Sequence, residues 1–233
     1  MKKKSSQNYG LALHTTTGQL GLAIANFTDQ SRQQTWDLGR DVSTYLHQYL
    51  SEFISPQTWT DIKFIAVAKG PGGFTGTRIG VVTARTIGQQ LNIPVFGIST
   101  LAAAVWEQKD RLSSEIIPIQ MPARRGQLFV AVYQISSESS DRPKGNCATL
   151  PEHLQRMPNH LNLIQTLPDT TMTLEGWQQT LANLETDYQL IKEPTNLGNT
   201  TTALLELAYN QWQQGKRPHW SETIPFYGQN PVE

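Results

Sequence analysis

The first sixty residues alternate between short apolar runs and polar turns, and the apolar spacing then changes from strand-like to helix-like. Residues 9–14 and 20–25 are two apolar segments separated by a polar turn that contains Gly18, which predicts a β-hairpin. A third strand is expected near residues 33–38. From Val42 to Phe53 apolar residues recur every three or four positions, as in an amphipathic helix.

The next stretch has the pattern of buried parallel strands followed by helices. Residues 64–68 form a continuous apolar run, typical of a strand that is covered on both faces. A Gly-rich loop (70–76) and a helix over 77–91 are expected after it, then a second buried strand (94–98) and a helix from Ser99 or Thr100 to about residue 107. Three meandering strands followed by strand, helix, strand, helix predict a ribonuclease-H-like unit.

The second half repeats this plan less clearly. A second hairpin is expected from residues 116–121 and 128–135 around Arg124-Arg125-Gly126. The weaker elements are helices near 151–156, 177–184 and 199–212 and strands near 171–174 and 188–191. We therefore predict an α/β fold that is actin-like, with two ribonuclease-H-like subdomains. Residues 1–108 carry the Gly-rich loop and the interface helices, and residues 109–233 form a smaller, degenerate copy whose last helix packs back on the first.

Charge and composition narrow the functional classes. The 233 residues contain 19 Lys and Arg against 19 Asp and Glu, so clustered basic charge for nucleic-acid binding is not expected and any role on RNA would be indirect. The longest apolar runs have six residues, too short for a membrane span, which needs ~20. We expect a cytoplasmic protein. Cys147 is the only cysteine, which excludes an internal disulfide.

The Gly-rich loop allows two interpretations. A loop that leaves a buried strand and opens a helix is a common phosphate site, but the glycine spacing matches neither the P-loop nor the dinucleotide fingerprint. The structural interpretation, tight turning and close packing, is favoured. If a nucleotide were bound, the candidate contacts are Thr15, Thr16, Gly72 and Gly73.

The helix after the loop carries a stripe of small residues. Gly80, Ala84 and Gly88 recur every four positions, which draws a surface of minimal side chains along one side of the helix. We predict that this helix meets a partner chain, with the preceding helix as its neighbour. The candidate interface residues are Tyr45, Tyr49, Arg78, Gly80, Val81, Ala84, Arg85 and Gly88.

The histidines and the remaining polar residues suggest no catalytic or metal site. His14, His47, His153, His160 and His219 do not stand at metal-ligand spacings, and no G-x-S-x-G nucleophile motif occurs. We therefore assign no catalytic residue and no metal ligand.

Residues 69–80 (KGPGGFTGTRIG) and 93–101 (IPVFGISTL) resemble the signature of the bacterial TsaB family, also called YeaZ. Weaker similarity extends over 13–25, over 123–126 with the strand after it, and over the Pro225-Phe226-Tyr227 ending. The resemblance implies a non-catalytic partner of TsaD which, together with the ATPase TsaE, serves the installation of threonylcarbamoyl on the adenosine beside the anticodon of certain tRNAs. It also implies that the two helices form one interface for TsaD and for self-association, and that partner subunits bind ATP and metal.

The chain departs from the family pattern at two turns. His14 and Pro122 stand where family members usually carry Asp. In an actin-like cleft these turns face the phosphates, and neither residue is a good Mg²⁺ ligand. The leading hypothesis is thus an assembly protein without a cofactor of its own. The alternative is a nucleotide-dependent phosphotransferase or ATPase that uses the cleft.

Overall fold

A computed structural model describes residues 8–137, 161–192 and 194–228. The first sheet has the strand order β3-β2-β1-β4-β5. Its strands are β1 (Tyr9–His14), β2 (Gln19–Ala25), β3 (Ser31–Asp37), β4 (Ile62–Ala68) and β5 (Val95–Ile98). The strands β1, β2 and β3 pair antiparallel, whereas β4 and β5 run parallel to β1. This is the ribonuclease-H-like arrangement that the sequence predicted.

Within the described residues, the second sheet repeats the arrangement with one strand fewer. Its order is β8-β7-β6-β9, formed by β6 (Ile116–Pro122), β7 (Leu128–Ser137), β8 (Leu161–Met172) and β9 (Ile191–Lys192). Again three strands pair antiparallel and the fourth, β9, runs parallel to the first of them. Two units on one plan give the molecule its actin-like architecture.

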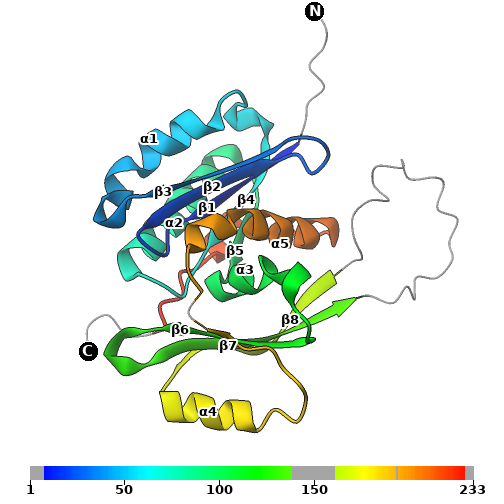
Figure 1. Cartoon of the computed structure of the whole chain (residues 1–233). Helices are drawn as coiled ribbons and strands as arrows, with labels where there is room; N and C mark the ends of the chain where they lie inside the picture. Colours follow the sequence, from blue (N-terminus) through cyan, green and yellow to red (C-terminus); the bar gives the residue numbers. More distant parts are fainter. Residues whose placement is uncertain (1–7, 138–160, 193, 229–233) are drawn as a thin grey trace, which may run out of the picture.

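In the described part of the chain, five α-helices pack on the faces of the two sheets (Figure 1). The helices are α1 (Val42–Ile54), α2 (Phe74–Leu91), α3 (Thr100–Trp106), α4 (Leu174–Ala182) and α5 (Thr201–Gln213). The helices α1 and α2 cover the outer face of the first sheet, whereas α3 and α5 lie between the sheets and share one core with both. The helix α4 covers the far face of the second sheet, where Trp177 is fully buried against β7.

Of the weaker predicted elements, one lies outside the described residues and one differs in its bounds. The helix expected near 151–156 lies outside the described residues. The strand expected at 171–174 is wrong in its bounds, because β8 starts ten residues earlier, at Leu161, and α4 already begins at Leu174. The strand β8 was not recognised from the sequence because it is an edge strand with one neighbour, none of its residues is fully buried, and apolar and polar residues are mixed along it.

The described C-terminal residues 218–228, which we call the C-terminal strap, connect the two sheets. The strap runs beside the edge strand β5, where Thr223 Oγ1 donates a hydrogen bond to the Val95 carbonyl at 2.8 Å. It then crosses the Gly-rich loop, where the Phe226 N–H donates to the Lys69 carbonyl at 2.7 Å. At its end the Gly228 carbonyl accepts from Thr171 Oγ1 in β8 at 2.7 Å.

Within the described ranges, no helix combines the length and the hydrophobicity needed to cross a membrane.

The helix α5 contacts four strands of the first sheet, although it follows the second sheet in the chain. The boundary between residues 108 and 109 stays a prediction.

Candidate functional site

The Gly-rich loop joins β4 to α2 and packs directly on the turn after β1. The Gly73 N–H donates to the Thr16 carbonyl at 2.7 Å, and Thr15 Oγ1 donates to the Gly76 carbonyl at 2.7 Å. A Cβ on Gly72 would overlap the Thr16 carbonyl oxygen and lie 2.7 Å from Thr16 Cβ. Glycine is needed here because two backbone segments approach closely.

The four residues proposed to contact a cofactor therefore do lie close together. They pack against one another, with the two threonines on the Gly-rich loop. Thr15 and Thr16 are buried, and their hydrogen-bonding groups are directed at the loop and at neighbouring side chains. The Thr16 hydroxyl lies 3.2 Å from Thr100 Oγ1 at the start of α3. A nucleotide role for Thr15, Thr16, Gly72 and Gly73 stays a prediction, and this packing does not favour it.

His14 ends β1 where the family resemblance expects an acidic residue. Its ring is completely buried, Nε2 lies 3.3 Å from Thr16 Oγ1, and Nδ1 has no hydrogen-bond partner among the described residues. Burial lowers the pKa of His14 from 6.5 to about 3, so the imidazole is neutral at pH 7. The turn therefore carries no negative charge that could attract a magnesium ion.

The small-residue stripe on α2 faces the protein's own interior. Val81 and Ala84 are completely buried. A Cβ on Gly80 would overlap Thr15 Oγ1, and one on Gly88 would overlap Val95 Cγ2. That Gly80, Val81, Ala84 and Gly88 meet a partner chain stays a prediction, and this packing does not favour it. Because these residues are small, α2 packs closely against the turn after β1 and against β5.

The opposite side of α2 is exposed, and we call Arg78, Val82, Thr86 and Gln89 the outer face of α2. Val82 lies at its centre with 52% of its surface exposed, which is unusual for a β-branched apolar side chain. Arg85 lies at the margin, its guanidinium 5.8 Å from the Trp220 ring centroid. Val82 was not among the predicted interface residues, although its position on the helix, away from the stripe, was a usable signal.

The two tyrosines of α1 lie towards the outer strand of the sheet. Tyr45 is 40% exposed. The ring of Tyr49 stacks on Trp36 of β3, with 4.7 Å between the ring centroids, and Tyr45 lies beside it. The structure thus separates the predicted interface into this aromatic group, the outer side of α2 with Arg78 and Arg85, and the buried stripe.

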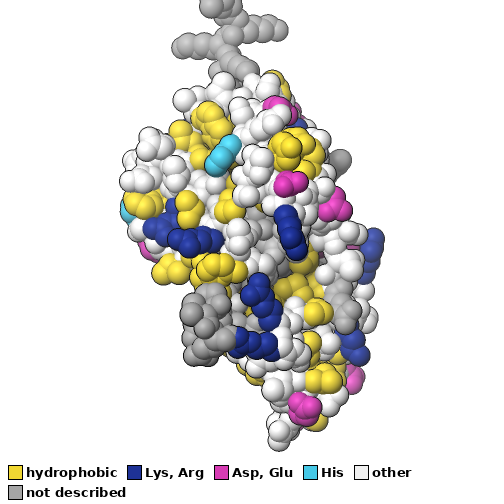
Figure 2. All heavy atoms as spheres, turned by 90° about the vertical axis from the view of Figure 1, so that its left-hand side faces the viewer, with side chains coloured by type: hydrophobic (Ala, Val, Ile, Leu, Met, Phe, Trp, Pro, Cys, Tyr) yellow, Lys and Arg dark blue, Asp and Glu magenta, His cyan; other side chains and the backbone are white. Residues whose placement is uncertain are grey.

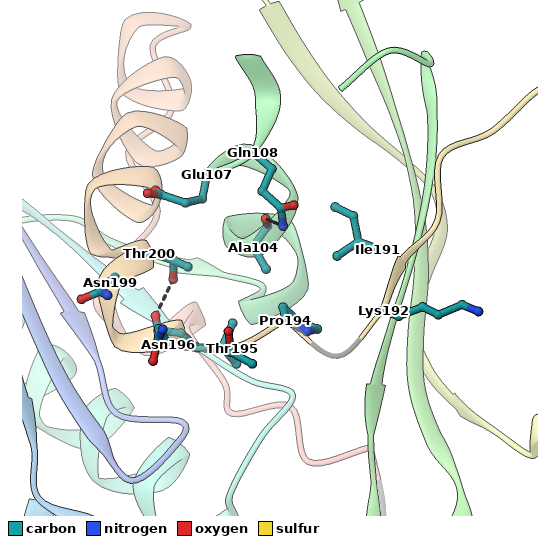
Figure 3. Close-up of a pocket in the computed structure, with 11 residues that line it drawn as sticks. Ala104, Glu107, Gln108, Ile191, Lys192, Pro194, Thr195, Asn196, Asn199 and Thr200 are labelled. Atoms are coloured by element: carbon teal, nitrogen blue, oxygen red, sulfur yellow. Dashed lines mark hydrogen bonds between the residues drawn. The ribbon is translucent and has the colours of Figure 1, made fainter. Parts of the chain in front are cut away.

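A cavity of about 440 Å³ lies elsewhere, between the end of α3, β9 and residues 194–200 (Figure 3). Glu107 and Gln108 line it from the residues directly after α3, and Asn196 and Asn199 line it from the connection to α5. Lys192 points away from the other labelled side chains. None of the described residues of the Gly-rich loop lines it. We therefore assign this cavity no role in nucleotide binding.

A polar cluster fixes the second sheet to the start of α3. The Tyr133 hydroxyl of β7 lies 2.9 Å from Asp169 Oδ1 of β8 and 3.2 Å from Ser99 Oγ, which caps α3. Burial raises the pKa of both Tyr133 and Asp169. The hydrogen bonds offset the cost of burying these polar groups and hold Asp169 inward.

Comparison with known proteins places the chain in a family. The family model described as TsaD, tRNA N6-adenosine threonylcarbamoyltransferase, matches residues 47–210 of the 233. The chain belongs to this family, as a member of its TsaB (YeaZ) branch. The resemblance predicted from the Gly-rich motif is confirmed.

Curated TsaB proteins match over part of their length. The "tRNA threonylcarbamoyladenosine biosynthesis protein TsaB" of Bacillus subtilis is 35% identical over 131 residues, which are 53% of this chain and 54% of that protein. TsaB of Escherichia coli is 35% identical over 78 residues, 32% of each chain. The matched part thus spans about half or less of these relatives.

Solved structures agree with the fold. "YeaZ from Pseudomonas aeruginosa" superposes with a TM-score of 0.66 at 17% identity, covering 94% of this chain and 99% of that one. A second structure, of "an uncharacterized protein with similarity to peptidase YEAZ" from the same organism, gives a TM-score of 0.68 at 17% identity and covers 95% and 100%. At this identity the matches establish the fold, and the predicted α/β two-sheet fold is confirmed.

Proposed function

We propose that this TsaB-family chain is a non-catalytic subunit of a cytoplasmic complex that installs threonylcarbamoyl on the adenosine beside the anticodon of tRNA. Its partner is TsaD, with TsaE joining through the complex. The observation that carries the proposal is the family match over residues 47–210, because the matching model is named for the transferase that acts on this tRNA adenosine.

The packing around β1 supports a non-catalytic role. The turn after His14 is occupied by its own contacts with the Gly-rich loop, and the imidazole is neutral and completely buried. A phosphotransferase would need an acidic or charged group here to hold a metal-nucleotide complex. ATP and metal accordingly belong to the partner subunits in this proposal.

The outer face of α2 is the surface that we propose for TsaD. Interface cores are depleted of charge and contain large side chains that become buried on binding. Val82 has the required exposure, and the arginines Arg78 and Arg85 lie around it as polar rim groups. Self-association of two copies through the same face would compete with TsaD.

The test is a binding titration of TsaD against the full chain and two variants on the same helix. Val82→Glu places a charge at the centre of the proposed interface and should weaken TsaD binding by at least about 30-fold. Gln90→Glu adds the same charge at an exposed position outside the outer face and should change binding less than about threefold. Equal affinities of the two variants would show that TsaD binds elsewhere.

A second measurement separates the enzymatic alternative. Reconstituted tRNA modification should require this chain together with TsaD and TsaE, and the isolated chain should not hydrolyse ATP. Turnover of Mg·ATP by the chain alone, lost on changing Thr15 and Thr16, would overturn the non-catalytic assignment.

A further inference from the structure

Three segments that are distant in the sequence meet at the N-terminal end of α2. The ring of Phe74, the first residue of α2, lies 4.5 Å from the ring of Tyr227 in the C-terminal strap. The carbonyl of the next residue, Gly228, accepts the hydrogen bond from Thr171 Oγ1, and Gly228 packs against the ring of Phe129. Phe129 is the second residue of β7, directly after the β6–β7 turn. The strap therefore places the first turn of α2 beside that turn.

The stretches around α2 and the β6–β7 turn carry basic residues without acidic ones, whereas the strap carries one acidic residue, Glu222. Residues 69–91 contain Lys69, Arg78 and Arg85, residues 116–137 contain Arg124 and Arg125, and neither stretch contains Asp or Glu. Arg78 follows Phe74 by four residues, so it lies on the same side of α2 one turn later. We call Phe74, Arg78, Arg124, Arg125 and Tyr227 the basic patch.

The basic patch faces solvent. Arg78, Arg124 and Arg125 are exposed, and Phe74 and Tyr227 are half-exposed. Arg78 and Arg125 make no ion pair with an acidic side chain of the described residues. Figure 2 shows Lys and Arg side chains gathered across the middle of the face formed by the α1 and α2 side of the molecule, with acidic side chains mostly towards its margins.

We propose that the basic patch binds the phosphate backbone of tRNA directly. This inference rests on the proposed function, in which the complex acts on tRNA. Guanidinium groups match phosphate oxygens with two parallel hydrogen bonds. The neighbouring rings of Phe74 and Tyr227 provide an aromatic surface on which an unpaired base stacks.

The sequence predicted only indirect contact with RNA, because it shows the sum of the charges and not where they lie. A net charge of zero is compatible with a local excess of positive charge when the acidic residues lie on other surfaces. The five members of the patch come from α2, the β6–β7 turn and the strap, so basic and aromatic residues are interleaved in space and not along the chain. An acidic protein surface is the competing occupant.

The test measures binding of an unmodified tRNA transcript to the full chain by fluorescence anisotropy at several salt concentrations. The variant Arg124→Glu with Arg125→Glu should bind at least about tenfold more weakly at low salt, and the slope of log affinity against log salt should fall by about 2. Arg125 has φ 59, so Glu there replaces a residue that already carries this backbone cost.

The matched control is Arg111→Glu with Lys192→Glu, which changes the net charge equally at exposed positions in the 3₁₀ turn after α3 and in β9. It should retain wild-type affinity within about twofold. Arg125→Glu alone keeps the test interpretable if the double variant unfolds, as judged by circular dichroism. Equal losses in both double variants, or no loss in either patch variant, would overturn the inference.

Partner binding is measured in parallel so that two failures can be told apart. If the patch variant no longer binds TsaD but, measured alone, still binds tRNA with unchanged affinity, the patch binds an acidic protein surface and the RNA inference is wrong. If the chain binds tRNA through these arginines but forms no complex with TsaD, the proposed function fails and the RNA inference stands.

Discussion

Replacing Gly80 by Ala tests whether the small-residue stripe of α2 packs within the chain. The added Cβ would overlap Thr15 Oγ1, yet it would lie 3.5 Å from Thr15 Cβ and 3.7 Å from Thr15 Cγ2. The obstruction is therefore one hydroxyl oxygen. Thr15→Ala removes that oxygen and leaves ordinary van der Waals contact between the two Cβ atoms.

The free energies of unfolding follow from these contacts. Gly80→Ala gains about 1 kcal/mol of helix propensity but costs about 3 kcal/mol through overpacking, a net loss of about 2 kcal/mol. Thr15→Ala loses about 2 kcal/mol, because a buried hydrogen bond and a methyl group disappear. In the double variant the overlap is gone and the helix gain remains, so the loss is about 1 kcal/mol where additivity gives about 4.

Urea unfolding followed by tryptophan fluorescence and circular dichroism measures this coupling of about 3 kcal/mol. Thr86→Ala, on the exposed side of the same helix, is the matched partner that should combine additively with Gly80→Ala to within about 0.5 kcal/mol. The reasoning is refuted if Gly80 and Thr15 also combine additively, or if Gly80→Ala alone stabilises the protein, as a solvent-facing glycine would.

Two further predictions concern acid sensitivity and the Gly-rich loop. Below pH 6.5 His14 is protonated in the unfolded chain, whereas in the folded chain it stays neutral down to about pH 3. The contribution of His14 to the free energy of unfolding is therefore fully present above pH 6.5, and about 2 kcal/mol of it is lost by pH 5. In urea unfolding, the free energy of unfolding of His14→Gln should fall by about 2 kcal/mol less between pH 7 and pH 5 than that of the original chain, whereas the exposed His47→Gln should not differ in this way. An equal fall in both variants would contradict a buried, neutral imidazole. Gly70→Ala should lower the melting temperature more than Gly126→Ala, because both have positive φ but only a Cβ on Gly70 overlaps a neighbour, the Phe226 carbonyl. Equal shifts would mean that the strap does not restrain the loop.

Periodicity predicted the elements that bury a whole face. The first hairpin, α1, β4 and α2 were expected close to their observed positions because each has a strong apolar pattern of period two or 3.6 or a continuous apolar run. The strand β8 was mostly missed, since a partly exposed edge strand buries no whole face and lacks such a pattern. The Gly-rich loop was expected as a tight turn with close packing, and its contacts with Thr15 and Thr16 have this character.

The candidate site was predicted only in part, for a reason that is visible in α2. The stripe of Gly80, Ala84 and Gly88 permits close approach by any neighbour, whether a strand of the same chain or another molecule. Spacing alone does not identify that neighbour. The structure shows that the β1 turn and β5 fill this role, which leaves Val82 and Arg78 on the exposed side.

The sequence by itself determined the family, the two-unit α/β plan and the Gly-rich connection, because these are local patterns of hydrophobicity and glycine. Only the tertiary structure decided which side of α2 is exposed and that the imidazole of His14 is buried and neutral. It also brought Phe74, Tyr227 and the β6–β7 arginines together through the C-terminal strap. Burial, pKa and surface charge depend on neighbours that are distant along the chain, and a sum over the sequence does not contain them.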